Sequence, residues 1–313
     1  MLKSKIIRNF SIVLLCLLII EILRIYPVEK ETIGNTSLNK GIIYMLDSNN
    51  YLSRLDVTYE AKDNESIVRE IIDILTIKTD KQNVREGFSP LIPENTKLLS
   101  VEINGDNVAL DFSKNFLDVS ENMEEKVVEA IVYSLTELDT INSVTIKVNH
   151  VLLQKLPHSL KKVPSIIDRT FKINKIYDLD TPHDITSTTI YFPAMSNDFK
   201  YYIPVTKYTN SEKEKIEIII DELESSNTYN SNIVNYINSE TKLINYEMLD
   251  KSLLLNFDRN IFGDIESKNI IEEVVYSINL SVRDSYDSLD SVMYYVDDSI
   301  IDTHFLLRGW VCK

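Results

Sequence analysis

An internal repeat constrains the fold of this chain more than any other feature of its sequence. The segment from Thr96 to Glu102 is matched, at an offset of 145 positions, by the segment from Thr241 to Glu247. At the same offset residues 110–116 fall on 255–261, so the register is kept across the turn between these segments without a gap. Self-similarity at a fixed period is a sign of a duplicated structural unit. The sequence therefore predicts two copies of one domain.

The segments that flank this core match at slightly different offsets. Residues 131–134 match 274–277 at 143, 144–148 match 292–296 at 148, 71–75 match 219–223 at 148, and 43–44 match 190–191 at 147. Differences of a few residues are what insertions in surface loops produce in a duplicated domain. All the matched segments occur in the same order in both copies, which supports the duplication.

Both copies predict the same order of elements: strand, short extended stretch, helix, hairpin, helix and strand. The first copy places them at 42–46, 51–57, 64–77, 98–112, 123–138 and 144–148. The second places them at 189–193, 200–205, 211–224, around the turn 249–252, and at 267–281 and 292–296. Asn104-Gly105 strengthens the first hairpin because this pair readily adopts the positive φ angles of tight turns. We expect an α+β fold in which each copy is a small mixed sheet with two helices on one face.

The N-terminal segment indicates export and attachment to a membrane. Lys3, Lys5 and Arg8 precede the apolar run 10–20, as the positive-inside rule describes. A single transmembrane helix over 6–26 is the preferred interpretation, because about 20 residues span a bilayer. A second interpretation is a cleaved signal peptide, although no small-x-small cleavage site follows the run. A third is a lipoprotein signal that places a lipid on Cys16, although the residue before it is not small.

We expect five segments along the chain. Residues 1–40 hold the membrane anchor or signal and a polar spacer, 41–153 the first domain, 154–187 a connector, 188–303 the second domain and 304–313 a tail. The connector contains three prolines and an alternating stretch at 171–177, which predicts a structured segment with a short strand. The tail contains the only tryptophan, Trp310, which could dock onto the second domain.

The charge of the chain excludes one class of partner, and its residues offer no catalytic set. Lys and Arg number 33 against 48 Asp and Glu, a net charge of −15, whereas nucleic-acid binding requires a surplus of cations. No phosphate-binding glycine loop, GxSxG or HExxH motif occurs. The four histidines, His150, His158, His183 and His304, are not spaced as metal ligands. We therefore expect no nucleic-acid partner, no cofactor, no metal and no enzymatic activity.

The repeated segments resemble the GerMN domain family. The resemblance lies in residues 90–101 and 108–113, in the helical segment 132–138 and in the strand after it, and it extends over 40–303. The family includes spore-formation and germination proteins that carry the domain in tandem behind an N-terminal membrane signal. The resemblance implies a fold like the ring-building modules of secretion systems and a non-catalytic role in the sporulation envelope.

Four positions in the family-like segments are candidates for contact with a ligand. Asp111 and Ser113 end a hairpin strand in the first copy, and Asn256 and Asp258 take their places in the second. The alternative, which we favour, is that these side chains bind backbone amides at a turn, as Asp and Ser often do.

These observations lead to one favoured function and one main alternative. The favoured hypothesis is a non-catalytic assembly or scaffold protein of the cell envelope, acting in sporulation or germination. A single N-terminal helix would hold it in the cytoplasmic membrane with both domains outside the cytoplasm, where it would bind a protein partner or further copies of itself. The alternative is a module that binds peptidoglycan or another envelope ligand. A cell-wall hydrolase is a weaker third hypothesis.

Overall fold

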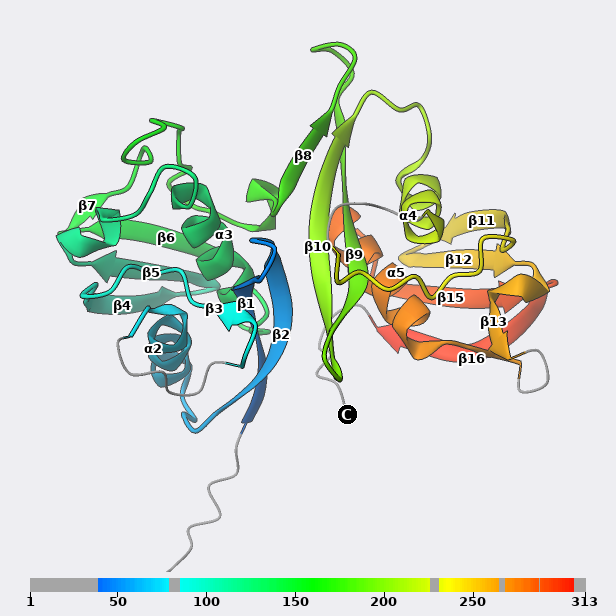
Figure 1. Cartoon of the computed structure of the whole chain (residues 1–313), viewed down its shortest axis with the longest axis horizontal. Helices are drawn as coiled ribbons and strands as arrows, with labels where there is room; N and C mark the ends of the chain where they lie inside the picture. Colours follow the sequence, from blue (N-terminus) through cyan, green and yellow to red (C-terminus); the bar gives the residue numbers. More distant parts are fainter. Residues whose placement is uncertain (1–38, 79–84, 226–230, 265–267, 287, 307–313) are drawn as a thin grey trace, which may run out of the picture. The chain divides into compact units, whose positions relative to one another are not determined.

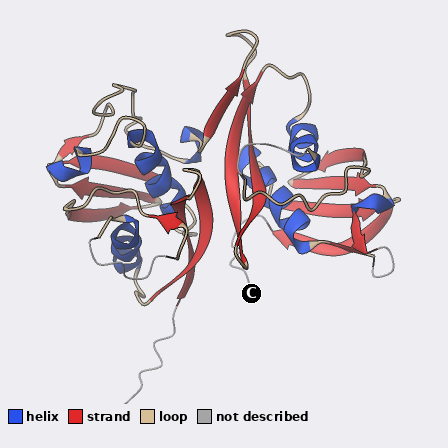
Figure 2. Cartoon of the chain, in the orientation of Figure 1, coloured by secondary structure: helices blue, strands red, loops and turns tan. Residues whose placement is uncertain are grey.

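The computed structural model describes residues 39–306, apart from 79–84, 226–230, 265–267 and 287. Within this part of the chain no helix is both long and apolar enough to cross a bilayer. The transmembrane helix predicted over 6–26, together with Cys16 and Trp310, lies outside the described residues. The described residues all belong to one compact unit, whose helices and strands are drawn in Figures 1 and 2.

The first copy begins with a hairpin and contains two α-helices among its described residues. Its elements are β1 (Asn39–Asp47), β2 (Leu52–Tyr59), α2 (Asn64–Leu75), β3 (Phe88–Ser89), β4 (Leu98–Asn104), β5 (Asn107–Phe112), the 3-10 helix η1 (Lys114–Leu117), α3 (Glu124–Leu135), β6 (Ser143–Val148) and β7 (Val151–Leu152). Helix α2 begins where the sequence predicts it, because the Asp63 side chain accepts a hydrogen bond from the Ser66 amide and so satisfies one free N–H of the first turn.

The connector and the second copy supply the remaining elements. They are η2 (Arg169–Phe171), β8 (Lys175–Asp178), β9 (Thr186–Ser196), β10 (Phe199–Thr209), α4 (Lys215–Glu224), β11 (Leu243–Leu249), β12 (Ser252–Phe257), η3 (Arg259–Ile261), β13 (Phe262–Asp264), β14 (Asn269–Ile270), α5 (Glu272–Ser285), β15 (Ser291–Val296) and β16 (Ser299–Leu306). The short strand expected in the connector is present as β8. Strand β16 continues past residue 303, so the first residues of the predicted tail belong to a sheet.

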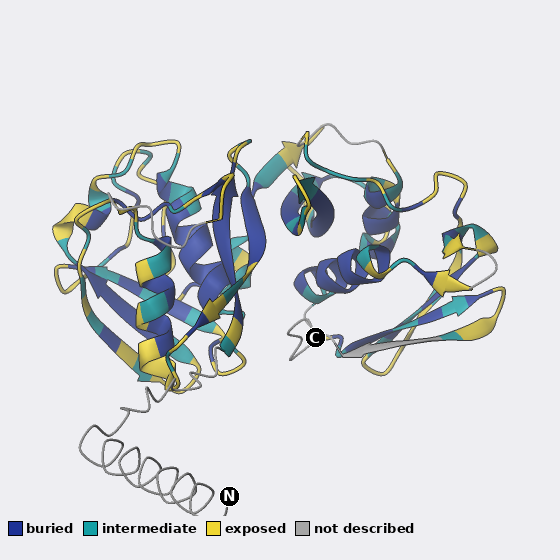
Figure 3. Ribbon diagram, turned by 60° about the horizontal axis from the view of Figure 1, so that its bottom comes forward, coloured by how far each residue is buried: buried dark blue, intermediate teal, exposed yellow. Residues whose placement is uncertain are grey.

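Each copy contains a four-stranded mixed sheet. The strand orders are β4-β5-β6-β7 and β11-β12-β15-β16. The central pair of each sheet is parallel and the outer pairs are antiparallel. Both predicted hairpins are present, with φ of 67° at Gly105 and 53° at Asp250 in their turns. The predicted α+β fold in two copies is therefore confirmed. Most residues of α3 and α5 are buried, and Figure 3 shows the buried residues of the chain in dark blue.

The leading hairpins of the two copies do not join these mixed sheets. β1 and β2 combine with β9 and β10 in a separate six-stranded sheet of order β3-β1-β2-β10-β8, in which β9 pairs with β10 (Figure 1). The prediction that each copy forms a single sheet is wrong for its first two strands. β1 is buried without interruption from Gly41 to Asp47, and a strand buried on both faces shows no alternation that could reveal its sheet.

Asn174 of the connector completes the sheet where the two copies meet. β2 and β10 are joined by a single antiparallel pair, Arg54 with Tyr202. The Asn174 side chain accepts a hydrogen bond from the Leu52 amide at 3.0 Å and donates to the carbonyls of Leu52 at 2.8 Å and Pro204 at 2.7 Å. These bonds satisfy backbone groups that strand pairing leaves free.

Helices α3 and α5 cover the outer edges of the two hairpins in equivalent ways. The Ser134 hydroxyl accepts a hydrogen bond from the Tyr44 amide, and the Ser281 hydroxyl accepts one from the Tyr191 amide, both at 2.9 Å. Ser134 is therefore equivalent to Ser281, at the offset of 147 that also relates the two tyrosines. The sequence match of 131–134 with 274–277 placed the second helix one turn out of register, because an apolar stripe repeats nearly every four residues.

Candidate functional site

A cluster of buried polar side chains lies where the two copies meet. At its centre the hydroxyls of Tyr44 and Tyr191 are 3.1 Å apart. Tyr44 donates to Glu137 Oε1 at 2.7 Å, and Tyr191 donates to Asp284 Oδ2. Each tyrosine lies on a leading hairpin and each carboxylate just beyond Ser134 or Ser281. The two copies therefore contribute equivalent tyrosine–carboxylate pairs.

Three arginines surround these pairs, and together the seven side chains form what we name the interdomain cluster (Tyr44, Arg54, Glu137, Arg169, Tyr191, Arg283 and Asp284). Arg169 of the connector binds Asp284 at 2.8 Å and Glu137 Oε1 at 2.8 Å. Arg283 of the second copy binds Glu137 of the first at 2.9 Å. Arg54 Nε lies 3.6 Å from the same carboxylate. Glu137 and Asp284 side chains are only 6% and 1% exposed.

The arginines keep both carboxylates ionised inside the protein. Burial alone would raise the pKa of Glu137, but Arg283, Arg169 and Arg54 outweigh it and hold that pKa well below its ordinary value. Burial likewise opposes ionisation of Asp284, yet Arg169 and Arg283 lower its pKa. Burial and the nearby Glu137 raise the pKa of Tyr44 to about 12, so it remains a donor at neutral pH.

This arrangement connects the copies and does not resemble a catalytic centre. Every carboxylate oxygen accepts from a guanidinium or a tyrosine hydroxyl, so neither acid is available to a substrate as a base. Ion pairs buried to this degree require near-complete hydrogen bonding to offset their desolvation. The bonds cross from one copy to the other and through the connector, so they fix how the copies pair.

The four motif positions bind backbone amides of their own domains. Asp111 accepts from the His150 amide at 3.0 Å, and its counterpart Asn256 accepts from the Asp298 amide at 3.2 Å. Each of these bonds holds the turn before the last strand of a mixed sheet. Ser113 accepts from the Lys97 amide at 2.9 Å, and its counterpart Asp258 accepts from the Lys242 amide at 3.1 Å. The two copies therefore use these positions alike. One bond holds the turn before the last strand of the sheet, and the other joins the residues on either side of its first hairpin.

The histidines lie apart in the described structure. His150 contacts Asp111 through Nδ1, while His158 and His183 are exposed in loops. Among the described residues no three His, Cys, Asp or Glu side chains are grouped as metal ligands. The side chain of His304 and both cysteines lie outside what the structure describes.

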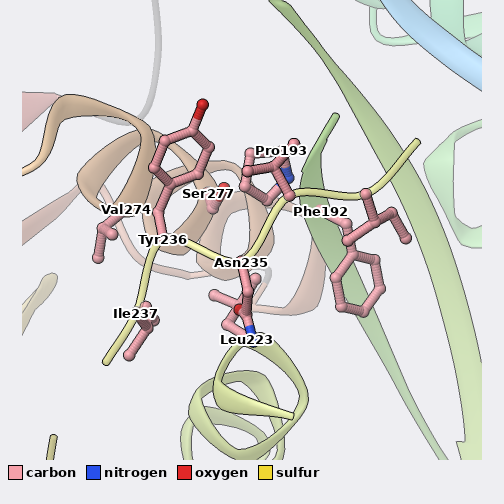
Figure 4. A pocket seen from close by; sticks show the side chains of 10 residues that line it. Phe192, Pro193, Leu223, Asn235, Tyr236, Ile237, Val274 and Ser277 are labelled. Atoms are coloured by element: carbon pink, nitrogen blue, oxygen red, sulfur yellow. The ribbon is translucent and has the colours of Figure 1, made fainter. Parts of the chain in front are cut away.

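A small apolar recess is present in the second copy (Figure 4). Phe192 and Pro193 of β9, Leu223 of α4, and Val274 and Ser277 of α5 form much of its lining. Its volume is about 10 Å³, which is room for about one water molecule. The buried Ser277 hydroxyl, which has no hydrogen-bond partner among the described residues, is part of this lining. The recess is far smaller than a saccharide site.

Known proteins resemble this chain in sequence and in fold. Residues 42–151 match the Germane family, described as "Sporulation and spore germination". The chain is 29% identical over 256 residues to the spore germination protein GerM of Bacillus subtilis (strain 168), covering 78% of this chain and 68% of that protein. It superposes on the tandem GerMN domains of the sporulation protein GerM from Bacillus subtilis with a TM-score of 0.74 and 25% identity, covering 84% of this chain and 92% of that structure. Residues 42–151 thus match this family, and the chain as a whole is similar to the tandem GerMN domains of GerM.

The sequence did not reveal the interdomain cluster that joins the two GerMN-like domains. Its signal was present, since Tyr44 and Tyr191, Ser134 and Ser281, and Glu137 and Asp284 are all related by the same offset of 147. The match of the second helices at 143 hid two of these three pairs. Arg169 had no signal at all, because the connector occurs once in the chain.

Proposed function

We propose that this chain is a non-catalytic scaffold protein of the cell envelope that acts in sporulation or germination. Its N-terminal segment would hold it in the cytoplasmic membrane, with the GerMN domains outside the cytoplasm. The similarity to GerM supports the biological process. The interdomain cluster carries the argument for a scaffold, because a protein that positions others must itself keep its domains in one fixed arrangement.

The outer strands of the two mixed sheets are the surfaces that would bind partners. Among the described strands, β4 and β11 each pair with one neighbour and so form one edge of their sheets. They carry exposed apolar side chains at equivalent positions, Leu99 at 42% and Ile244 at 52% exposed. An edge strand with exposed apolar residues can add a strand from another chain. Both domains present this feature, so one chain would offer two such edges.

The main alternative is a module that binds peptidoglycan, and it predicts a cleft that accepts a saccharide. One aromatic residue of the second domain, Tyr201, packs against Phe88 of the first domain and gives no support to such a role. Phe88 stacks edge-on against Tyr201 with ring centroids 4.9 Å apart, and Tyr201 is 2% exposed. The Tyr201 hydroxyl accepts a hydrogen bond from Asn232. Its ring is therefore used within the fold.

Light scattering of residues 38–313 over a concentration series, alone and with muropeptides, tests the proposal. A scaffold that self-associates will exceed monomer mass as concentration rises, whether or not the saccharide is present. A monomer that binds muropeptide would support the binding module instead. A monomer that does neither would reject self-assembly and leave a different protein as the partner to be sought.

Charged substitutions then show whether the edge strands are responsible. Leu99→Lys and Ile244→Lys together place a charge on each edge, which is how natural proteins prevent strand addition. We expect this double variant to remain monomeric. Ile77→Lys is the matched control, since Ile77 is exposed to the same degree, 41%, but lies outside both sheets. Equal association of the control and the double variant would show that the edges play no part.

A further inference from the structure

One stretch of the chain, from the end of the first domain into the connector, has a charge opposite to that of the whole chain. Residues 140–167 contain no Asp or Glu, although the chain carries 48 of them and a net charge of −15. The same stretch contains Lys147, Lys155, Lys161 and Lys162. The last three belong to the segment Gln154–Val163, which follows β7 and which we name the basic loop (Figure 1).

The basic loop is held in one conformation. The Val163 amide donates to the Gln154 carbonyl and the Leu156 amide to the Lys161 carbonyl, both at 2.9 Å. Leu156 and Val163 are buried beneath it. At its tip the buried carboxylate of Glu124 accepts from the backbone amides of His158 and Ser159, each at 2.8 Å. The loop is therefore a built hairpin whose outward side chains are placed by the fold.

Two lysines of this hairpin face each other, with no counter-charge among the described residues. Lys155 and Lys162 are directly paired across it, and like charges in that position destabilise a strand pair. Among the described residues no carboxylate forms an ion pair with either of them, whereas the adjacent Lys161 binds Glu125 at 2.5 Å. Their repulsion would be relieved by an external anion between them.

The tip of the loop adds an exposed apolar side chain in an unfavourable backbone conformation. Leu160 has a φ of 56°, a region that non-glycine residues other than Asn and Asp rarely occupy. Its side chain is 64% exposed, and Ile166 nearby in the sequence is 61% exposed. An exposed leucine in this conformation, two residues before Lys162, is costly for the fold alone, and such outliers are found at functional sites.

We infer that the basic loop is a contact site for an anionic phospholipid bilayer, in which Leu160 enters the interface while Lys155 and Lys162 bind lipid phosphates. Apolar side chains flanked by lysines are the pattern of surfaces that lie in the headgroup region. Anionic lipids attract nearby lysines, while the acidic remainder of the chain is repelled, so this loop is the part that would approach. An acidic protein would satisfy the lysines but gives no role to the exposed leucine tip. The inference requires neither self-association nor a protein partner.

Vesicle sedimentation of residues 38–313, the compact unit that lacks the apolar N-terminus, tests this contact. Vesicles of phosphatidylcholine with 30% phosphatidylglycerol are compared with phosphatidylcholine alone, at low and at raised salt. We expect binding only to the anionic vesicles, weakened by salt. Lys155→Gln with Lys162→Gln should lower the partition coefficient about 30-fold, which is two lysines at about 1 kcal/mol each.

The control variants separate the contact from general charge and from damage to the fold. Lys97→Gln with Lys114→Gln removes the same charge from exposed positions outside the loop and should bind as the unchanged fragment does. Leu160→Asn suits a positive φ, and loss of the lysine pair removes repulsion. Both loop variants should therefore be at least as stable as the parent while binding less. No sedimentation with anionic vesicles, or equal losses in the loop and control variants, would overturn the inference, and the first result would point to an acidic protein instead.

Discussion

Removal of Arg169 is the most direct test of the interdomain cluster. This side chain binds both buried carboxylates, and it also donates to the Thr136 hydroxyl at 3.0 Å and the Tyr133 carbonyl at 3.3 Å. Arg169→Met keeps the volume but leaves Glu137 and Asp284 with less positive charge. Loss of one partner from a buried ion pair costs about 3–5 kcal/mol. We expect a fall of that size in the free energy of unfolding of residues 38–313 at pH 7.

The cost should depend on pH in a defined direction. In the parent, Glu137 and Asp284 have pKa values lowered by the arginines. Their contribution to stability is therefore complete above the ordinary carboxyl pKa and is lost as pH falls through the folded-state values. Without Arg169 the effect of burial on both carboxylates is less fully opposed. Their pKa values are therefore higher than in the parent, and protonation becomes easier in the folded variant. The difference between parent and variant should be largest at pH 7 and should shrink toward pH 4.

Urea unfolding at several pH values measures both effects. Arg69→Met is the matched control, because Arg69 pairs with Glu65 at 2.8 Å with both side chains about half exposed. Such a pair contributes less than about 1 kcal/mol. Equal losses for the two variants at pH 7 would refute the reasoning, and so would a cost for Arg169→Met that grows as the pH falls.

Two further predictions concern the joining of the domains and one concerns a motif position. Because β2 and β10 share a sheet and the cluster bridges both copies, calorimetry should show a single transition; two separate transitions would mean that the domains unfold independently. Ser281→Ala removes the acceptor of the Tyr191 amide and should lower the free energy of unfolding by about 1–3 kcal/mol, whereas Ser277→Ala should change it very little. If urea unfolding shows the larger loss for Ser277→Ala, the match of 131–134 with 274–277 would be correct instead. Asp111→Asn should be tolerated better than Asp111→Ala, since Asn256 holds the equivalent turn; similar thermal midpoints for the two variants would contradict that role.

The sequence predicted what depends on local patterns. Duplication, hairpins at Gly105 and Asp250, and the existence of both helices in each copy follow from periodicity and turn chemistry, which act over short distances. The six-stranded sheet does not, because β1 is buried throughout and its partner in the other copy depends on long-range packing. Asn174 and Arg169 were not predicted for the same reason. Each is a single residue in a connector, and its role appears only when distant segments are brought together.

The interdomain cluster also explains how one pairing of two similar domains is selected. Apolar residues could give comparable stability, but they would not distinguish the second domain from another copy of the first. The cluster does so because its arginines are not repeated: the position equivalent to Arg283 is Thr136, at the offset of 147. Two first domains brought together this way would oppose two Glu137 side chains without Arg283 to bind them, and such unpaired charges disfavour the wrong partner.

Arg283→Thr makes the two helices alike at this position and tests that argument. It removes the bonds of 2.9 and 3.2 Å from Arg283 to Glu137, so we expect a loss in urea unfolding of about 3–5 kcal/mol, as for Arg169→Met. It should also increase exchange of domains between chains, seen as dimers after refolding at high protein concentration. A stable, monomeric variant would show that pairing is selected by the shared sheet and not by the arginines.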